Sequence, residues 1–273
     1  CPVDWSHPLN LGLVGCWMVP PNAGWRGGLT MRDLVRGGKK PNDGTLTNMA
    51  FPATSTSGWS GPKGRPGGYG ALAFDGTDDY ASSASPVASS VATVALWVRP
   101  STTSDGTVAS LAISGRADVY FVIEARGGKW AVVARNTAFR NAAASASFSA
   151  GAWYHLAIAW ESATAQKLYV NGTLAATQTT SVTPFAPTIF YLARLRSTDT
   201  VGKFAGGQID DARVFSRPLS AGEIAALYDQ SRRGHPDAMR WLSTRAFFGP
   251  QAAAGTFQPA WAAGSNVVIG GAF

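Results

Sequence analysis

Residues 152–174 read AWYHLAIAWESATAQKLYVNGTL and contain two strand-like segments in succession. Large apolar side chains alternate with small or polar ones in the first segment, as in a strand with one face in a core. Asn171 and Gly172 both tolerate positive φ and therefore predict a two-residue type I′ hairpin turn. Together with Thr173 they also form a glycosylation sequon, but the turn explains the Asn-Gly pair without a sugar. The stretch predicts antiparallel β structure.

Similar segments recur along the chain at short intervals, and most are bounded by Gly, Pro, Asn, Asp or Ser. This spacing is typical of an all-β sandwich or barrel rather than of βαβ units. No internal repeat with a period of roughly 20–50 residues is visible. The predicted strands lie near 12–19 and at 71–76, 91–100, 107–114, 118–125, 129–135, 152–160, 166–172, 173–180, 188–195 and 207–215.

A short helix is predicted after the last strand. Ser220 and Glu223 have the spacing of a capping box, in which each side chain satisfies a backbone N–H at the start of a helix. The apolar side chains that follow share one helical face: Ile224, Leu227 and Tyr228. The expected end is marked by two cations and a glycine: Arg232, Arg233 and Gly234. This pattern predicts a single short helix packed on a sheet.

The composition is that of a soluble globular chain. Of the 273 residues, 45% are hydrophobic and 14% are charged, which is enough apolar material for a core. No apolar run approaches the roughly 18 residues that a membrane span needs. The net charge of +7 reflects few acidic residues, since only GGKK and SRRG place two cations side by side. A nucleic-acid-binding face normally has denser Lys and Arg with interleaved aromatics. We therefore expect neither a membrane span nor a nucleic-acid partner.

The two cysteines, Cys1 and Cys16, do not have the spacing of a metal site. They are either paired in a disulfide or both free, and the sequence leaves both states open. No charged and apolar leader precedes Cys1, so a signal peptide is either already removed or was never present. A first-position Cys is what removal of an initiator Met leaves, whereas lipidation of Cys1 is the alternative, without a visible lipobox. We expect cytosolic synthesis.

Residues 11–230 read as one body, because no low-complexity linker divides them. We expect residues 1–10 to form an N-terminal arm. Residues 17–70, rich in Gly, Pro and Trp, are expected to form a long loop excursion, and a loop of that length is usually functional or disordered. Residues 231–273 carry aromatic side chains without helical or strand periodicity. We expect them to form an arm that docks on the sandwich or on a neighbouring subunit.

Seven segments occur in a fixed order over residues 11–230: GLVGCW, DGTLTN, ALAFDGTDDY, VALWVRP, WYHLAIAW, LYVNGTL and GGQIDDARVFSRPLSAGEIAALY. In kind and order they resemble the laminin-G-like members of the concanavalin A-like jelly-roll superfamily. The resemblance implies an all-β fold of two antiparallel sheets, each of about six or seven strands. It also implies a concave face that binds ligands in many relatives, and commonly a bound calcium ion.

Three other segments are similar to proteins encoded in bacteriophage and prophage-like gene sets: PVDWSHPLNLGLVGCW, RDLVRGGKKPNDGTLTNM and FQPAWAAGSNVVIGG. This second resemblance covers less of the chain. It implies a virion-associated protein, which fits the absence of a visible signal peptide.

Enzymatic chemistry is not expected from the acidic residues. Hydrolases of the superfamily that the chain resembles use two glutamates on one strand, about 5–5.5 Å apart in a retaining glycosidase. This chain has three glutamates, of which Glu223 is the capping residue, and no second carboxylate lies within a few residues of Glu124 or Glu161. Scattered histidines do not make a zinc site, and no nucleophile elbow, Walker loop or dinucleotide fingerprint is present.

Calcium is the metal that the acidic residues favour. Asp75, Asp78 and Asp79 lie in one predicted turn, and calcium takes six to eight oxygen ligands. The resemblance implies that the early and last strands are close, which adds Asp210 as a candidate ligand. The alternative is that the aspartates only shape the turn through hydrogen bonds to the backbone.

Strand alternation separates the two aspartates of the last predicted strand. It places Asp210 on the face of Ala212 and Val214, and it places Asp211 beside Arg213, where an ion pair is expected. The two carboxylates are therefore not expected to act as a catalytic pair.

The predicted function is that of a non-enzymatic structural protein of a phage virion, which decorates the capsid or belongs to a tail or spike. The expected partners are the major capsid protein or other virion proteins, and host surface glycans bound on the sandwich face. A homo-oligomer or multicopy assembly is expected. The alternatives are a secreted bacterial carbohydrate-binding or adhesion module, located outside the cell or on its surface, and a glycan-degrading enzyme.

Overall fold

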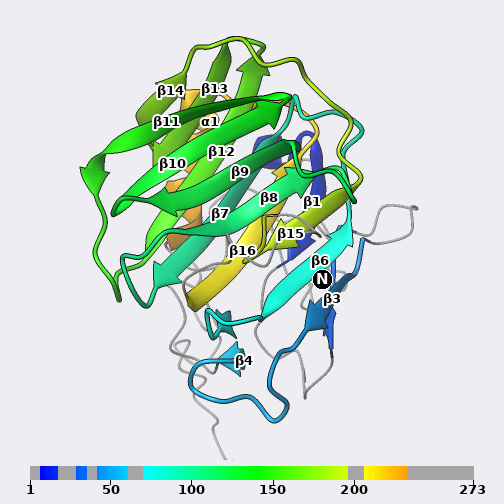
Figure 1. Cartoon of the computed structure of the whole chain (residues 1–273), viewed down its shortest axis with the longest axis vertical. Coiled ribbons are helices and arrows are strands. Elements are labelled where there is room, and N and C mark those ends of the chain that lie inside the picture. The colour runs from blue at the N-terminus through cyan, green and yellow to red at the C-terminus, as the bar shows by residue number, and fades with distance from the viewer. Residues whose placement is uncertain (1–6, 18–28, 36–41, 61–69, 196–205, 233–273) are drawn as a thin grey trace, which may run out of the picture. The chain divides into compact units, whose positions relative to one another are not determined.

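The structure is a computed structural model and describes residues 7–17, 29–35, 42–60, 70–195 and 206–232. All of these belong to a unit that spans Cys1–Trp241. The described residues form two antiparallel sheets of eight strands each, a short 3-10 helix and one α-helix (Figure 1). The expected all-β, two-sheet sandwich with a short C-terminal helix is confirmed.

Sheet A contains both the first and the last strand of the described chain. Its order is β14-β13-β12-β7-β16-β5-β4, and β1 pairs with β16. Segments far apart in sequence thus meet at the centre of one sheet. The strands are β1 (Leu13–Trp17), β4 (Gly58–Ser60), β5 (Ala71–Phe74), β7 (Thr93–Pro100), β12 (Tyr154–Ser162), β13 (Ala165–Val170), β14 (Thr173–Gln178) and β16 (Gly207–Phe215).

Sheet B has the order β11-β10-β9-β8-β15-β6-β3-β2. Most of its neighbours are consecutive in sequence, as in a meander of hairpins. The strands are β2 (Thr30–Met31), β3 (Gly44–Thr47), β6 (Tyr80–Ala84), β8 (Gly106–Ala112), β9 (Val119–Arg126), β10 (Lys129–Asn136), β11 (Ala138–Ser147) and β15 (Ile189–Leu192).

The core fills the space between the two sheets. Alternate side chains of both sheets point inward and form one large apolar cluster. Aromatic pairs bridge the layers: Trp17 of β1 stacks on Phe190 of β15 at 4.9 Å, and Phe121 of β9 meets Trp160 of β12 edge to face at 5.1 Å. Packing between the two sheets therefore stabilises the sandwich.

The predicted hairpin turn joins β13 to β14. Asn171 and Gly172 have φ values of 49° and 79°, as a type I′ turn requires. The Asn171 side chain also accepts a hydrogen bond from the backbone N–H of His155 on β12, at 2.9 Å. A Cβ on Gly172 would lie 3.1 Å from Tyr228, so glycine lets the turn pack closely against the helix.

The helix α1 (Ala221–Arg232) covers the outer face of sheet A, where Ile224 and Leu227 pack into a second apolar cluster. Its capping box forms as predicted: the Ser220 Oγ accepts from the N–H of Glu223 at 3.3 Å, and Glu223 accepts from the N–H of Ser220 at 2.8 Å. Glu223 is also held by both terminal nitrogens of Arg217. Of the residues expected to end the helix, Arg233 and Gly234 lie outside the described residues.

Residues 17–70 are not one uninterrupted loop in their described parts, because they contribute β2, β3 and β4. The buried Asp33 ties this segment to the sandwich. Its Oδ1 accepts hydrogen bonds from the N–H groups of Cys16 at 2.9 Å and Val35 at 3.0 Å, and its Oδ2 accepts from the N–H of Asn42 at 3.1 Å. Local strand signals are weak over two to four residues, so the sequence did not reveal these short edge strands.

The two expected arms fall mostly outside the described residues. Of residues 1–10, the structure describes 7–10, where Pro8–Asn10 form the 3-10 helix η1. Of residues 231–273, it describes only the last two residues of α1, Ser231 and Arg232. Cys1 is also outside, so the state of the two cysteines stays open. Burial raises the pKa of the Cys16 thiol, which disfavours its thiolate form.

Candidate functional site

An acidic loop, residues 75–79, connects β5 to β6. Carboxylate oxygens of Asp75, Asp78 and Asp79 lie within 4.8 Å of one another. Part of the loop is shaped by the expected side-chain to backbone bonds: the Asp75 Oδ1 accepts from the N–H of Thr77 at 2.7 Å, and the Asp79 Oδ2 accepts from the N–H of Asp75 at 2.9 Å. The turn-shaping role and a cation site are therefore compatible, because these bonds use one oxygen of each of the two carboxylates.

Asp79 provides the observation that favours a cation. The residue is only 4% exposed, and its Oδ1 is buried without a hydrogen-bond partner in the described part of the protein. Burial raises the pKa of this carboxyl group, since the charged form loses its hydration. A buried and unsatisfied carboxylate oxygen beside two more carboxylates fits a hard cation such as calcium. Backbone carbonyls and water would have to complete the coordination.

Asp210, the fourth candidate ligand, is not brought to this loop. It pairs with Trp97 on β7, three residues along β16 from Gly207, which pairs with Phe74 at the start of the acidic loop. Three residues of a strand span about 10 Å. The acidic group that the structure assembles among the described residues contains the three loop aspartates without Asp210.

A β-bulge corrects the predicted faces of the last strand. The register of β16 against β7 shifts by one residue between Asp210 and Arg213, and Asp211 has a φ of 52°. Asp210 therefore lies on the outer face of sheet A, opposite Trp97, whereas Ala212 and Val214 point into the core. The predicted sharing of a face by these three residues is wrong, because strict alternation fails where a bulge inserts an extra residue.

The predicted ion pair between Asp211 and Arg213 is confirmed. Arg213 donates from Nε to one carboxylate oxygen at 2.6 Å and from Nη2 to the other at 2.9 Å, and its side chain is 1% exposed. Burial disfavours the charged guanidinium, but Asp211 together with the nearby Cys16 and Asp210 outweighs this effect, so the pKa of Arg213 is raised. The pair is a buried structural element of sheet A.

A groove with several polar side chains in its lining lies beside the acidic loop, at the same rim of the sandwich. Its volume is about 360 Å³, within the range of roughly 300–1,000 Å³ that is usual for small-molecule clefts. Five chain segments converge on it, including the ends of β5 and β7 and the start of β16. The groove is lined by Ser55, Thr56, Ala73, Phe74, Asp75, Arg99, Pro100, Ser101, Gly151, Gly207 and Gln208.

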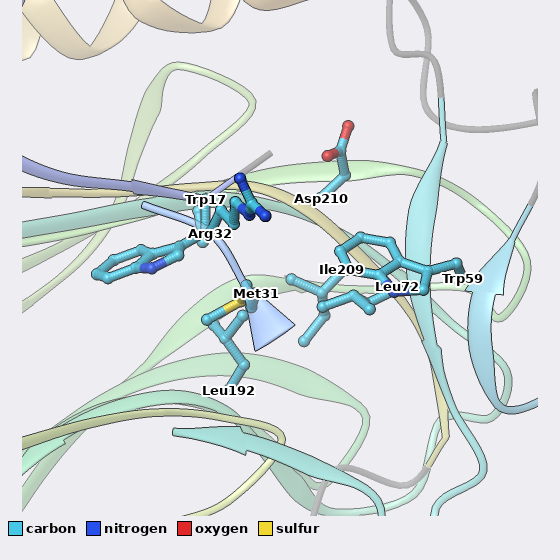
Figure 2. A pocket seen from close by; sticks show the side chains of 9 residues that line it. Trp17, Met31, Arg32, Trp59, Leu72, Leu192, Ile209 and Asp210 are labelled. Atoms are coloured by element: carbon cyan, nitrogen blue, oxygen red, sulfur yellow. The ribbon is translucent and has the colours of Figure 1, made fainter. Parts of the chain in front are cut away.

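A second cavity is too small for a ligand. Figure 2 shows that it lies among apolar side chains of both sheets, including Met31, Leu72 and Leu192. Its volume of about 10 Å³ is close to the least that holds one water molecule. The carboxylate of Asp210 points away from the apolar side chains in this view. We treat this cavity as a packing defect between the sheets.

The three glutamates lie on different elements and each makes an ion pair. Glu124 on β9 pairs with Arg126 at 2.6 Å, Glu161 on β12 pairs with a lysine of β13 at 2.7 Å, and Glu223 pairs with Arg217. His155, buried beneath α1, meets the rings of Trp97 and Tyr228 edge-on or tilted. These side chains hold local structure.

Sequence reasoning missed the groove. Arg99 and Gln208 are side by side only because β7 pairs with β16, more than one hundred residues later in the chain. The glycine pair before Gln208 was a signal, because consecutive glycines at a strand start permit a close backbone approach. The acidic loop, in contrast, was found because its aspartates are adjacent in sequence.

Helices within the described residues are too short or too polar to serve as a transmembrane segment.

Comparison with solved structures shows the fold. Domain 4 of AbnA, an extracellular arabinanase from Geobacillus stearothermophilus in complex with arabinotriose, is 19% identical, with a TM-score of 0.58; the match covers 79% of this chain and 98% of that one. Trypanosoma rangeli sialidase in complex with sialic acid is 17% identical, with a TM-score of 0.58, over 82% of this chain and 34% of the sialidase.

The receptor binding domain of botulinum neurotoxin D is also similar, at 13% identity and a TM-score of 0.55, over 81% of this chain and 53% of that one. The chain thus spans about a third of the sialidase and about half of the toxin domain. At these identities the likeness concerns the fold alone.

No curated protein sequence matches the chain. The family model Laminin_G_3, described as the concanavalin A-like lectin/glucanases superfamily, matches residues 75–225, which is more than half of the chain. The match begins at the acidic loop and ends within α1, so it contains β7 and β16 beside the groove but not β5 or residues 55–56. The chain belongs to the concanavalin A-like lectin/glucanases superfamily.

Proposed function

We propose that this protein is a non-enzymatic glycan-binding module and that the groove beside the acidic loop is its binding site. The observation that carries the proposal is the chemistry of the lining. Hydroxyl, carboxylate, amide and guanidinium groups from Ser55, Thr56, Asp75, Gln208 and Arg99 converge on one open cleft. Sugars are recognised by such sets of hydrogen-bonding groups in a concave site.

The comparisons support carbohydrate binding at the level of the fold. The arabinanase domain is matched over almost its whole length, and its structure holds arabinotriose. Fold alone does not assign a ligand, so the hydrogen-bonding side chains of the groove are needed to locate a site in this chain.

Calcium is proposed as a structural partner of the site. Asp75, Asp78 and Asp79 would hold the ion, with the unsatisfied Oδ1 of Asp79 as its most buried ligand. When bound, the ion would neutralise repulsion among the three carboxylates. It would also fix the end of β5, where Asp75 borders the groove.

The absence of catalysis is a further part of the proposal. A glycosidase needs two carboxyl groups that face one bond of the substrate. Glu124, Glu161 and Glu223 are engaged in separate ion pairs, and Asp75 is the acidic residue that lines the groove.

A role on a phage virion is proposed from the sequence resemblance to phage and prophage-like proteins. In this setting the chain would decorate the capsid or belong to a tail or spike, in several copies, and would contact capsid or other virion proteins. The alternative is a secreted bacterial carbohydrate-binding module. Mass spectrometry of purified particles would detect the chain as a stoichiometric component; its absence from particles, with the chain recovered from the medium, would favour the secreted module.

A glycan array tests the binding function directly. The whole chain should bind a defined subset of glycans in 1 mM calcium, and the signal should fall at least about tenfold for Asp75→Asn, which removes a charged hydrogen-bond acceptor from the groove. Asp118→Asn, at an exposed site on the β8–β9 turn, is the matched control and should bind as the unchanged chain does. Binding that survives every change to the groove lining would place the site elsewhere, and a folded chain that binds no glycan would remove the proposal.

A further inference from the structure

We infer that Arg99 makes the groove selective for sugars that carry a carboxylate group. The inference rests on the proposed glycan-binding function and adds the chemical class of the ligand. Its basis is the geometry of one exposed arginine, which the structure fixes in place without giving it an acidic partner.

The guanidinium of Arg99 is anchored on one side only. Its Nε donates to the backbone carbonyl of Gly151 at 2.7 Å, and its Nη1 donates to the side-chain oxygen of Gln208 at 3.3 Å. Its Nη2 donates to no side chain or carbonyl of the described residues, and Arg99 is exposed at the groove. The edge formed by Nη1 and Nη2 therefore keeps N–H groups for a ligand. Two parallel N–H groups match the two oxygens of a carboxylate.

The hydrogen-bond partners of Arg99 are neutral, in contrast to those of five other described arginines. These five hydrogen-bond or pair with a carboxylate of the same chain: Arg116, Arg126, Arg213, Arg217 and Arg232. Arg99 instead bonds to a carbonyl and an amide, which hold the guanidinium without neutralising its charge. A carboxylate ligand would supply the missing negative charge.

The anchor points are themselves fixed by close backbone contacts. Gly207 has a φ of 135°, and a Cβ at this position would lie 2.3 Å from the carbonyl oxygen of Arg99. Ser101 donates its N–H to the carbonyl of Gly206 at 3.0 Å, and Gly151 donates to the carbonyl of Pro100 at 2.7 Å. The three chain segments around Arg99 are therefore joined to one another by hydrogen bonds and close backbone packing. A guanidinium held in place before binding loses less conformational entropy when a ligand arrives.

The rest of the lining suits a sugar more than a simple anion. Ser55 and Thr56 offer hydroxyl groups, Asp75 accepts hydrogen bonds from ligand hydroxyls, and the amide nitrogen of Gln208 is a donor. The favoured ligand therefore has its carboxylate at Arg99 and its hydroxyl groups toward Asp75, as a uronic or sialic acid residue allows.

Matched sugars with and without the charge test the inference. Isothermal titration of the whole chain, in 1 mM calcium, would compare trigalacturonate with its methyl ester and 3′-sialyllactose with lactose. In at least one pair the acid should bind roughly 10- to 100-fold more tightly than the neutral sugar, the range expected for a charge-assisted hydrogen bond. Arg99→Gln should reduce binding of the acid to the level of the neutral sugar, with a change of less than about threefold for the neutral sugar itself.

Two control variants distinguish carboxylate recognition by Arg99 from the effect of net charge, and unfolding measurements exclude an effect on folding. Arg116→Gln removes one positive charge from the exposed β8–β9 turn, at the far end of β8 from the groove, and should leave both affinities unchanged. Arg99→Lys keeps the charge but loses the planar fork, and should retain only part of the preference for the acid. Thermal unfolding of each variant checks that the fold is kept.

The outcomes distinguish the inference from the function on which it rests. If acidic and neutral sugars bind equally, or Arg99→Gln weakens both alike, the selectivity is refuted while glycan binding stands. If a sulfated sugar binds and no carboxylated sugar does, the ligand class is refuted. If none of the sugars binds the folded chain in calcium, both proposals fail.

Discussion

Arg213 and Arg99 project from the same outer face of sheet A but differ in their exposure to solvent and in the charge of their hydrogen-bond partners. Arg213 is 1% exposed and makes two hydrogen bonds to Asp211. Arg99 is exposed at the rim and bonds only to neutral groups. A buried arginine whose charge is balanced within the fold stabilises structure, whereas an exposed one that is held but not neutralised is available to a ligand.

The same contrast separates the two groups of aspartates. Asp211 is fully engaged by its arginine at the centre of the sheet. Asp79 is equally buried in the acidic loop, yet one of its oxygens has no partner among the described residues. Burial alone therefore does not distinguish structural carboxylates from candidate ligands. The number of carboxylate oxygens that have a hydrogen-bond partner distinguishes the two kinds.

The largest effect is expected from breaking the buried pair. Asp211→Asn keeps the size of the side chain and tolerates the positive φ of this position, but it leaves the charge of Arg213 uncompensated. We expect the free energy of unfolding to fall by about 3–5 kcal/mol, measured by urea denaturation.

Asp118→Asn serves as the matched control, since it breaks an exposed Asp–Arg pair. Its effect should be near the limit of detection, because exposed pairs are screened by solvent. Equal losses in the two variants would contradict the structural role of the Asp211–Arg213 pair.

A somewhat smaller effect is expected from calcium. If the acidic loop binds the ion in the folded state only, a calcium concentration of 100 times the Kd should raise the free energy of unfolding by about 2.7 kcal/mol. Asp79→Asn should abolish most of this increase, because it removes the buried charged ligand. Thermal unfolding with calcium and with EDTA measures both. An equal response of the chain and of Asp79→Asn would exclude Asp79 as a ligand.

The next largest loss of stability is expected where Gly207 packs against the backbone of Arg99. Gly207→Ala should lower the free energy of unfolding by about 2 kcal/mol, because the new Cβ would meet a backbone oxygen and the φ value disfavours a side chain. Gly128→Ala, also at positive φ but with open space around its Cβ, should lose about 1 kcal/mol. A Gly207 variant that is no less stable than its control would show that the strands do not meet as closely as described.

The smallest effect concerns the ion pair between Arg217 and Glu223 at the start of α1. The hydrogen bonds from Arg217 lower the pKa of Glu223 to about 2, and the bonds from Ser220 act in the same direction, whereas burial opposes them. The depressed pKa means that the charged form stabilises the fold above about pH 4.5 and that this contribution is lost as the pH falls toward 2.

Glu223→Gln should therefore lower the stability at pH 7 by at most about 1 kcal/mol, since the pair is partly exposed. The difference between the variant and the unchanged chain should vanish as the pH falls from 4.5 to 2, followed by urea denaturation at each pH. A difference that persists at pH 2 would have to come from something other than the charge of Glu223.

The sequence predicted those features whose determinants are close together in the chain. The Asn171–Gly172 turn, the Ser220–Glu223 capping box and the cluster of Asp75 with its neighbours each depend on residues within a few positions. The all-β sandwich followed from the alternation and spacing of strands. These elements needed no knowledge of long-range contacts.

Features set by pairing across the sheet were not predicted. The bulge at Asp210–Arg213 shifts a register that strict alternation assumed, although aspartate tolerates the left-handed conformation that Asp211 adopts. The groove needs Arg99 and Gln208 to become neighbours, and it needs Gly207 to let their strands approach. Such contacts depend on tertiary structure, which local propensity does not encode.

The most direct test is a crystal structure of the chain with calcium and a carboxylate-bearing oligosaccharide. The account predicts an ion among Asp75, Asp78 and Asp79 and a sugar in the adjacent groove, with its carboxylate at the Nη1–Nη2 edge of Arg99. A sugar bound on the outer face of sheet B, with the groove beside Arg99 filled only by water, would contradict it.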